Sequence, residues 1–136
     1  MGSITEQQRQ TWNKFSSGWQ KWDEFVLAWL KPIGNQLLEE VNLQSTDKVL
    51  DVSTGTGEPG LTAATKVAKV IATDVAEDMV EIARLNALNR KLTNFEVKVA
   101  DAEHLPFDDK SFDGVVCRLG VMYFGNPQVG VNEMAR

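Results

Sequence analysis

A glycine-rich turn directly after a short β-branched run constrains the fold of this chain more than any other feature. The run covers residues 48–52, and the turn reads Gly-Thr-Gly-Glu-Pro-Gly at residues 55–60. This arrangement matches the G-x-G-x-x-G pattern, in which a strand leads through a tight turn into a helix and the backbone approaches a ligand closely. The turn therefore predicts a strand–turn–helix unit with a ligand at its tip.

The sequence around and after the turn alternates between strand and helix. Apolar spacing and β-branched runs predict helices at residues 61–67 and 76–89, and strands at residues 48–52, 70–73, 95–100 and 114–117. Strands and helices that alternate at this spacing form parallel strands joined by crossover helices. The strand runs lack strict alternation, which is typical of strands covered on both faces. We therefore predict an α/β fold with a Rossmann-like, doubly wound parallel sheet.

Residues 1–44 have a helical pattern and are expected to form an N-terminal extension, or lid, on the domain at residues 45–136. Apolar side chains recur there at steps of three and four, at Trp12, Phe15, Trp19, Trp22, Val26, Trp29 and Ile33. The segment 16–18 (Ser-Ser-Gly) is expected to break or bend this helix, and Pro32 to end it before a second helix that reaches Val41. The tryptophan face is interpreted as core packing, with a lid over a ligand site as the alternative.

Composition and charge exclude several classes of protein. The chain has 136 residues, which suits one domain, and a formal net charge of −5, which disfavours binding to nucleic acid phosphates. No apolar run approaches the ~20 residues of a membrane span and no leader is visible, so a cytoplasmic location is expected. The single cysteine, Cys117, and the single histidine, His104, exclude a disulfide framework and indicate no metal site. We expect Cys117 to lie in the core and His104 to be an ordinary loop residue.

The charges around the turn distinguish between two cofactors. Asp74 follows the second predicted strand, where a carboxylate would meet ribose hydroxyls, and on its own this would suggest NAD. However, Asp51 precedes the turn and Glu58 lies inside it, and two carboxylates would oppose a diphosphate. They suit a cationic ligand instead. S-adenosylmethionine carries a sulfonium and an ammonium group and has no phosphate.

Four segments of the chain carry a more specific pattern than the glycine turn alone. They read VLDVSTGTG at 49–57, TDVAEDM at 73–79, ADAEHLPF at 100–107 and SFDGVV at 111–116. In sequence and order they resemble class I S-adenosylmethionine-dependent methyltransferases, and they are similar to the small-molecule branch that includes the ubiquinone- and menaquinone-biosynthesis enzymes. The resemblance extends over residues 45–136. A tight turn with no ligand is the alternative for the glycines.

The resemblance implies that one group of residues holds the adenosine part of S-adenosylmethionine. Asp74 would accept hydrogen bonds from both ribose hydroxyls, and Val75 and Met79 would contact the adenine. Asp101 would accept from the adenine amino group, and the Ala102 amide would donate to a ring nitrogen. These roles agree with the donors and acceptors that each group offers. A helix N-cap is the alternative role for Asp101.

The resemblance implies that a second group of residues holds the methionine part. The loop that contains Ser53, Thr54, Gly55 and Gly57 would approach it. Asp51 would help hold the ammonium group, through water or the loop amides, and the backbone around Arg118 would meet the same end. One departure from the family motif is that Ser53 stands where its first glycine usually stands. Because serine has fewer accessible backbone conformations than glycine, we expect an altered approach there.

The family sheet has seven strands, whereas four are predicted here, in the order 3-2-1-4. We therefore expect the cofactor-binding half of a methyltransferase that acts on a small-molecule methyl acceptor and yields S-adenosylhomocysteine, with no catalytic residue nominated. A non-catalytic cofactor-binding or protein-interaction module, or an engineered truncation of such an enzyme, are the alternatives. Residues 114–118 would form an exposed edge strand. A homodimer is expected, through this edge or through exchanged N-terminal helices.

Overall fold

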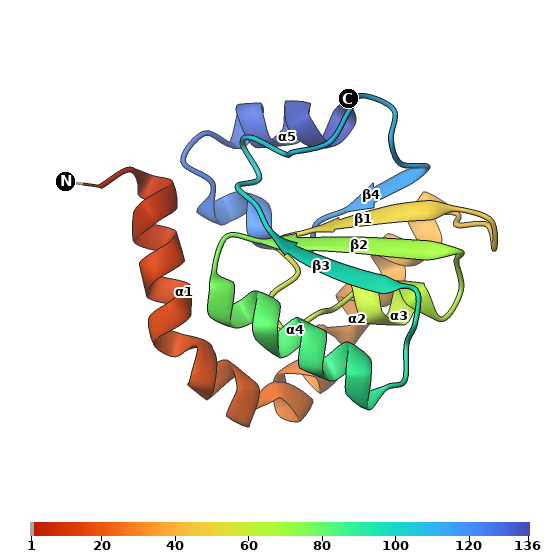
Figure 1. Cartoon of the computed structure of the whole chain (residues 1–136), viewed down its shortest axis with the longest axis horizontal. Coiled ribbons are helices and arrows are strands. Elements are labelled where there is room, and N and C mark those ends of the chain that lie inside the picture. Colours follow the sequence, from red (N-terminus) through yellow and green to blue (C-terminus); the bar gives the residue numbers. More distant parts are fainter. Residues whose placement is uncertain (1) are drawn as a thin grey trace.

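The computed structural model describes residues 2–136 and contains one parallel sheet with the strand order β3-β2-β1-β4 (Figure 1). The strands are β1 (Lys48–Val52), β2 (Lys69–Asp74), β3 (Phe95–Val99) and β4 (Gly114–Val116). The helices that follow them are α3 (Gly60–Ala64), α4 (Glu77–Asn89), the 3-10 helix η1 (Gly120–Tyr123) and α5 (Pro127–Ala135). The predicted doubly wound α/β fold and its strand order are confirmed. The 3-10 helix was not predicted.

The central strand β1 buries alternate side chains on the two faces of the sheet. Val49 packs on the face that the N-terminal part of the chain and α3 cover, in a cluster with Leu38 and Val70. Leu50 and Val52 pack on the opposite face, in a cluster to which Met134 of α5 adds. Figure 1 shows α3 and α4 on one side of the sheet and α5 on the other. Two covered faces explain why the strand runs lack a polar side.

The N-terminal extension consists of α1 (Ile4–Lys21) and α2 (Asp23–Val41), and two expectations about it are wrong. The break lies at Trp22 rather than at residues 16–18, and Ser16 lies inside α1, where it is buried and its hydroxyl lies 3.4 Å from an Asp78 carboxylate oxygen of α4. Pro32 lies inside α2 and does not end it. A proline inside a helix costs ~3 kcal/mol, and the packing of α2 side chains, among them Leu37, Leu38 and Val41, against the core opposes this cost.

Helix α1 stands across the carboxyl ends of the strands, at the left in Figure 1, and α4 holds it there. The Asn13 amide donates to a Glu77 carboxylate oxygen at 2.8 Å, and its oxygen accepts from the Asp78 backbone N–H at 3.0 Å. Trp12 and Trp19 pack against the apolar start of α4. These contacts place α1 over the end of the sheet where the glycine turn lies.

The predicted tryptophan face divides into a buried part and an exposed part. Trp12 and Trp19 are partly buried against α4, as the core interpretation expects. Trp22 and Trp29 are 57% and 77% exposed, and Phe25 beside them is 62% exposed, so that interpretation is wrong for this part of the face.

None of the helices in residues 2–136 is long and apolar enough to cross a lipid bilayer.

Candidate functional site

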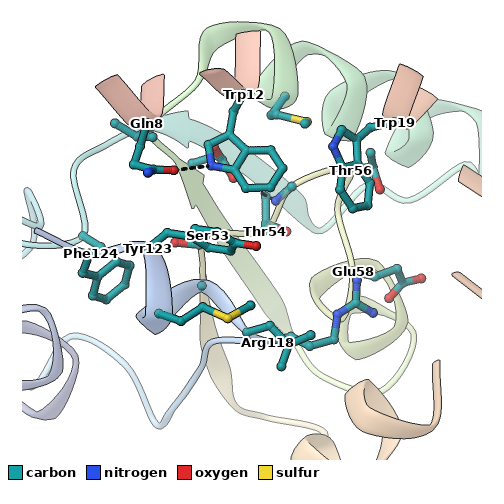
Figure 2. Close-up of a pocket in the computed structure, with 18 of the residues that line it drawn as sticks. Gln8, Trp12, Trp19, Ser53, Thr54, Thr56, Glu58, Arg118, Tyr123 and Phe124 are labelled. Atoms are coloured by element: carbon teal, nitrogen blue, oxygen red, sulfur yellow. Dashed lines mark hydrogen bonds between the residues drawn. The ribbon is translucent and has the colours of Figure 1, made fainter. Parts of the chain in front are cut away.

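A cavity of about 190 Å³ lies at the carboxyl ends of the strands, beneath α1 and α2 (Figure 2). In an open parallel sheet, ligands bind where the strand order reverses, and here that point lies between β1 and β4. The predicted site residues that line the cavity are Ser53, Thr54, Gly55, Asp74, Val75, Met79, Asp101, Ala102 and Arg118. Asp51 and Gly57 do not line it. The fold therefore gathers the ends of all four strands around one cavity.

Asp74 ends β2 and joins it to the glycine turn. Its Oδ2 accepts from the Gly55 backbone N–H at 2.9 Å, and its Oδ1 accepts from the Ala76 backbone N–H at 3.0 Å. The side chain is buried, and this burial raises the pKa of Asp74. Each carboxylate oxygen still has a free lone pair. Asp74 can therefore fix the turn and accept hydrogen bonds from a pair of ligand hydroxyls.

Asp101 follows β3 and organises the turn after it. Its Oδ1 accepts from the Glu103 backbone N–H at 2.9 Å, and its Oδ2 lies 3.1 Å from His104 Nδ1. Asp101 therefore accepts a backbone hydrogen bond in the manner of an N-cap, and its side chain also lines the cavity. The N-cap role and the ligand-binding role are thus compatible. The His104 side chain is exposed and does not line the cavity, which agrees with an ordinary loop residue.

Asp51 lies fully buried beneath the turn and supports it from below. Its Oδ2 accepts from the Thr54 hydroxyl at 2.7 Å and from the Gly60 backbone N–H at 2.8 Å. Its Oδ1 has no hydrogen-bond partner within residues 2–136. Burial raises the pKa of Asp51 to about 7, more than its hydrogen bonds lower it. Asp51 therefore acts on the cavity through Thr54.

Ser53 adopts a left-handed backbone conformation, with φ of +57°, at the position where the family motif usually has glycine. A Cβ atom in this region costs roughly 1–2 kcal/mol. The loop after β4 accommodates it because Gly120 has no side chain, and a Cβ there would lie 2.5 Å from the Ser53 Cβ. Gly120, the first residue of η1, thus leaves room for the Ser53 side chain, and the altered approach of a cofactor there stays a prediction.

Aromatic side chains from distant parts of the chain form the roof of the cavity, and of these the sequence singled out Trp12 and Trp19 but not Tyr123. The Trp12 and Tyr123 rings meet edge to face at 5.2 Å, and Trp12 lies 5.7 Å from Trp19. The Trp12 Nε1–H donates to the Gln8 side chain at 3.1 Å, the bond drawn in Figure 2. The tryptophan spacing was the available signal, through its alternative interpretation as a lid. Nothing local marked Gln8 or Tyr123.

Glu103 is a further cavity residue that sequence reasoning did not identify. Its carboxylate accepts from the Asn126 backbone N–H at 2.7 Å, from the Gly125 backbone N–H at 3.2 Å and from the Thr5 hydroxyl at 3.3 Å. It therefore ties α1 and the segment before α5 to the end of β3. Because Glu103 and Thr5 lie far apart in the sequence, no local pattern predicts that Glu103 contacts α1.

The charged side chains that line the cavity are mostly acidic. Glu58, Asp74, Asp101 and Glu103 supply carboxylates, whereas Arg118 supplies the only positive side chain among the lining residues within 2–136. An acidic lining suits a cationic ligand and disfavours a diphosphate. S-adenosylmethionine fits this set, since its charges are a sulfonium, an ammonium and one carboxylate. No three His, Cys, Asp or Glu side chains within residues 2–136 converge to hold a metal ion.

The methyltransferase-domain family matches residues 49–136 of the chain. The chain belongs to this family. Over 114 residues, this methyltransferase domain is 32% identical to the uncharacterized methyltransferase YcgJ of Bacillus subtilis, covering 84% of the chain and 45% of that protein. The crystal structure of the Bacillus protein superposes with a TM-score of 0.73 at 30% identity, over 76% of this chain and 44% of the other.

Two further relatives name an activity. Over 90 residues the domain is 36% identical to a demethylmenaquinone methyltransferase of Clavibacter sepedonicus, covering 66% of this chain and 36% of that enzyme. It also resembles the crystal structure of a SAM-dependent methyltransferase of Aquifex aeolicus, with a TM-score of 0.69 at 28% identity over 76% of this chain and 56% of that one. The chain thus spans between 36% and 56% of the length of these relatives.

Proposed function

We propose that the chain binds S-adenosylmethionine and forms the cofactor-binding part of a methyltransferase that acts on a small molecule. The observation that carries this proposal is the acidic cavity on which the ends of all four strands converge. When bound, S-adenosylmethionine supplies a methyl group activated by its sulfonium. The remaining tasks, which are binding, orientation and exclusion of water, belong to the side chains of the cavity.

The polar residues on the floor of the cavity would bind S-adenosylmethionine and fix its orientation. Asp74 would accept from the two ribose hydroxyls, and its bond to Gly55 holds the turn at a fixed distance from it. Asp101 and the Ala102 amide would bind the polar edge of the adenine, and Val75 and Met79 would contact its faces. The Thr54 hydroxyl, held by Asp51, fixes the loop near the methionine end.

The aromatic roof excludes water and shapes the space for an acceptor. Trp12, Trp19 and Tyr123 cover the floor, and Leu27 and Leu30 of α2 extend the apolar wall. Apolar and aromatic walls favour a small apolar acceptor, and the similarity to the Clavibacter enzyme supports the same class. Positioning alone can supply much of the rate of a transfer between two bound groups. We therefore assign no general base.

Calorimetric titration with S-adenosylhomocysteine and with NAD tests the cofactor. We expect S-adenosylhomocysteine to bind and NAD to bind far more weakly. Asp74→Ala should weaken the binding of S-adenosylhomocysteine by roughly 10- to 100-fold, because it removes charged hydrogen-bond acceptors. Asp108→Ala, at an exposed carboxylate outside the cavity, is the matched control and should leave it unchanged. Tighter binding of NAD would overturn the proposal.

Transfer itself is tested with labelled cofactor and a panel of quinols, phenols and amines. Turnover that Asp101→Ala abolishes would support the enzymatic function. Binding of S-adenosylhomocysteine with no turnover of any acceptor would favour the alternative, a cofactor-binding module that transfers no methyl group.

A further inference from the structure

An exposed aromatic surface lies at the corner where α1 meets α2, at the bottom of Figure 1. We call it the corner patch, and it consists of Phe15, Trp22, Phe25 and Trp29, which are between 54% and 77% exposed. Phe15, Trp22 and Phe25 line one apolar groove, and the Trp29 ring lies 6.0 Å from the Phe25 ring. The patch is therefore continuous, and the proposed function makes no use of it.

The groove in the corner patch contains a glycine that the fold of residues 2–136 does not require. Gly18 lies inside α1, where glycine is less favourable than alanine, and its backbone is not left-handed. Outside its own helix, a Cβ atom on Gly18 would have no neighbour within 4 Å among these residues. Trp19 and Val26 complete the groove. The missing side chain therefore leaves room for a group from outside the chain.

The area of the corner patch is sufficient for a weak dimer. A fully covered aromatic side chain buries about 150–250 Å², so four of them at these exposures offer roughly 500 Å² in each copy. Two copies together would bury roughly 1,000 Å², which is the lower limit for a specific interface. A two-fold interface uses the same patch on both copies, so the patch must supply both a groove and a protruding group. Trp29, at 77% exposed, supplies the protruding group.

The rim of the corner patch carries both signs of charge. The Lys14 and Lys21 ammonium groups lie over two rings of the patch, 5.5 Å and 5.4 Å from the ring centres. Glu24, which is exposed, adds a carboxylate next to Phe25 in the sequence. A surface of anionic lipid would favour lysines alone. A two-fold interface instead needs both signs, because it places the lysines of one copy opposite the glutamate of the other.

We propose that the corner patch binds the corner patch of a second copy of this chain, with the Trp29 ring of each copy in the groove over Gly18 of the other. Each copy keeps its own α1 in place, so this arrangement differs from an exchange of N-terminal helices. It also leaves the edge of β4 outside the interface. The inference does not depend on the proposed function.

Sedimentation velocity of the ligand-free chain over a range of concentrations tests this interface. For the wild type we expect a dimer with a dissociation constant in the micromolar range, since the area is at the lower limit. Gly18→Gln should raise this constant at least tenfold, because the longer side chain fills the groove. The same variant should unfold at a higher temperature than wild type, because glutamine favours a helix more than glycine does. Loss of folding therefore cannot account for the loss of the dimer.

Trp29→Ala should also raise the dissociation constant at least tenfold. Leu88→Gln, at a side chain of α4 that is 59% exposed, is the matched control and should leave it unchanged. A wild-type chain that stays monomeric at high micromolar concentration would overturn the proposal. A dimer that either Gly18→Gln or Trp29→Ala leaves intact would overturn it as well. A monomer that sediments with vesicles of phosphatidylcholine and phosphatidylglycerol would also overturn it and would assign the patch to a lipid surface.

Discussion

Among single residues, Asp51 has an environment that makes the stability of the fold depend on pH. Its pKa is about 7 in the folded chain because of burial, against an ordinary value of 3.8. Below pH 4 the carboxyl group is protonated in both states. Between pH 4 and pH 7 the unfolded chain loses this proton and the folded chain keeps it, so the free energy of unfolding falls as the pH rises.

Asp51→Asn should remove this loss, because an amide keeps the acceptor for Thr54 and Gly60 and carries no charge. Relative to wild type, its free energy of unfolding should increase across pH 4 to 7, by at most ~4 kcal/mol from the size of the shift. Urea unfolding of the ligand-free chains at pH 4.5 and pH 8 measures the difference. Identical pH slopes for the two chains would contradict the prediction.

The left-handed Ser53 leads to a second prediction at this scale. Ser53→Gly removes the Cβ from a strained conformation, whereas Ser53→Ala removes only the hydroxyl and keeps the Cβ. We expect the glycine variant to be more stable than the alanine variant by about 1 kcal/mol, since relief of strain exceeds the added flexibility of the unfolded chain. Thermal unfolding of the pair is the measurement. An alanine variant as stable as the glycine variant would show that no strain is stored there.

Among the elements, α1 is the one whose contribution to the site is most directly testable. Trp12→Ala should weaken the binding of S-adenosylhomocysteine by roughly tenfold and make α1 more sensitive to proteolysis, because Trp12 both lines the cavity and packs on α4. Trp29→Ala is the matched control, since Trp29 is 77% exposed and lies outside the cavity. Equal effects of the two substitutions on binding would show that α1 does not contribute to the site.

The elements also show which parts of the site a sequence can predict. Asp74 is the last residue of β2 and Asp101 lies just after β3, and parallel topology brings such strand ends to one edge whatever the rest of the chain does. Trp12 and Gln8 reach the same edge because α1 contacts residues far away in the sequence, through Asn13 among others, and no local pattern encodes those contacts. Pro32 failed as a helix stop for the same reason, since tertiary packing outweighed a local preference.

At the scale of the whole molecule, the exposed apolar surface leads to a prediction about assembly. Trp22, Phe25 and Trp29 are largely exposed on the N-terminal helices, and within residues 2–136 the strand β4 pairs on one side only, with β1. Both features favour association with another chain. We predict that this chain forms a homodimer or larger assembly.

Light scattering measures the assembly directly, and a monodisperse monomer at high micromolar concentration would contradict it. A double variant, Trp22→Gln with Trp29→Gln, separates the two routes. Dissociation of the variant would indicate the helical surface, and an unchanged mass would indicate the edge of β4.

The way in which α4 holds α1 also has a kinetic consequence. The Arg9–Glu77 pair that joins the two helices has a distance of 3.1 Å and is exposed to solvent, so dissolved salt screens it. If α1 must move away from α4 before a ligand leaves, the residence time of the ligand depends on how strongly this pair holds the two helices together. We expect the dissociation rate of S-adenosylhomocysteine to rise about two- to fivefold between low and high ionic strength, the range for an exposed pair. Stopped-flow fluorescence of the tryptophans would record it, and Glu77→Gln should reduce the dependence of the rate on salt.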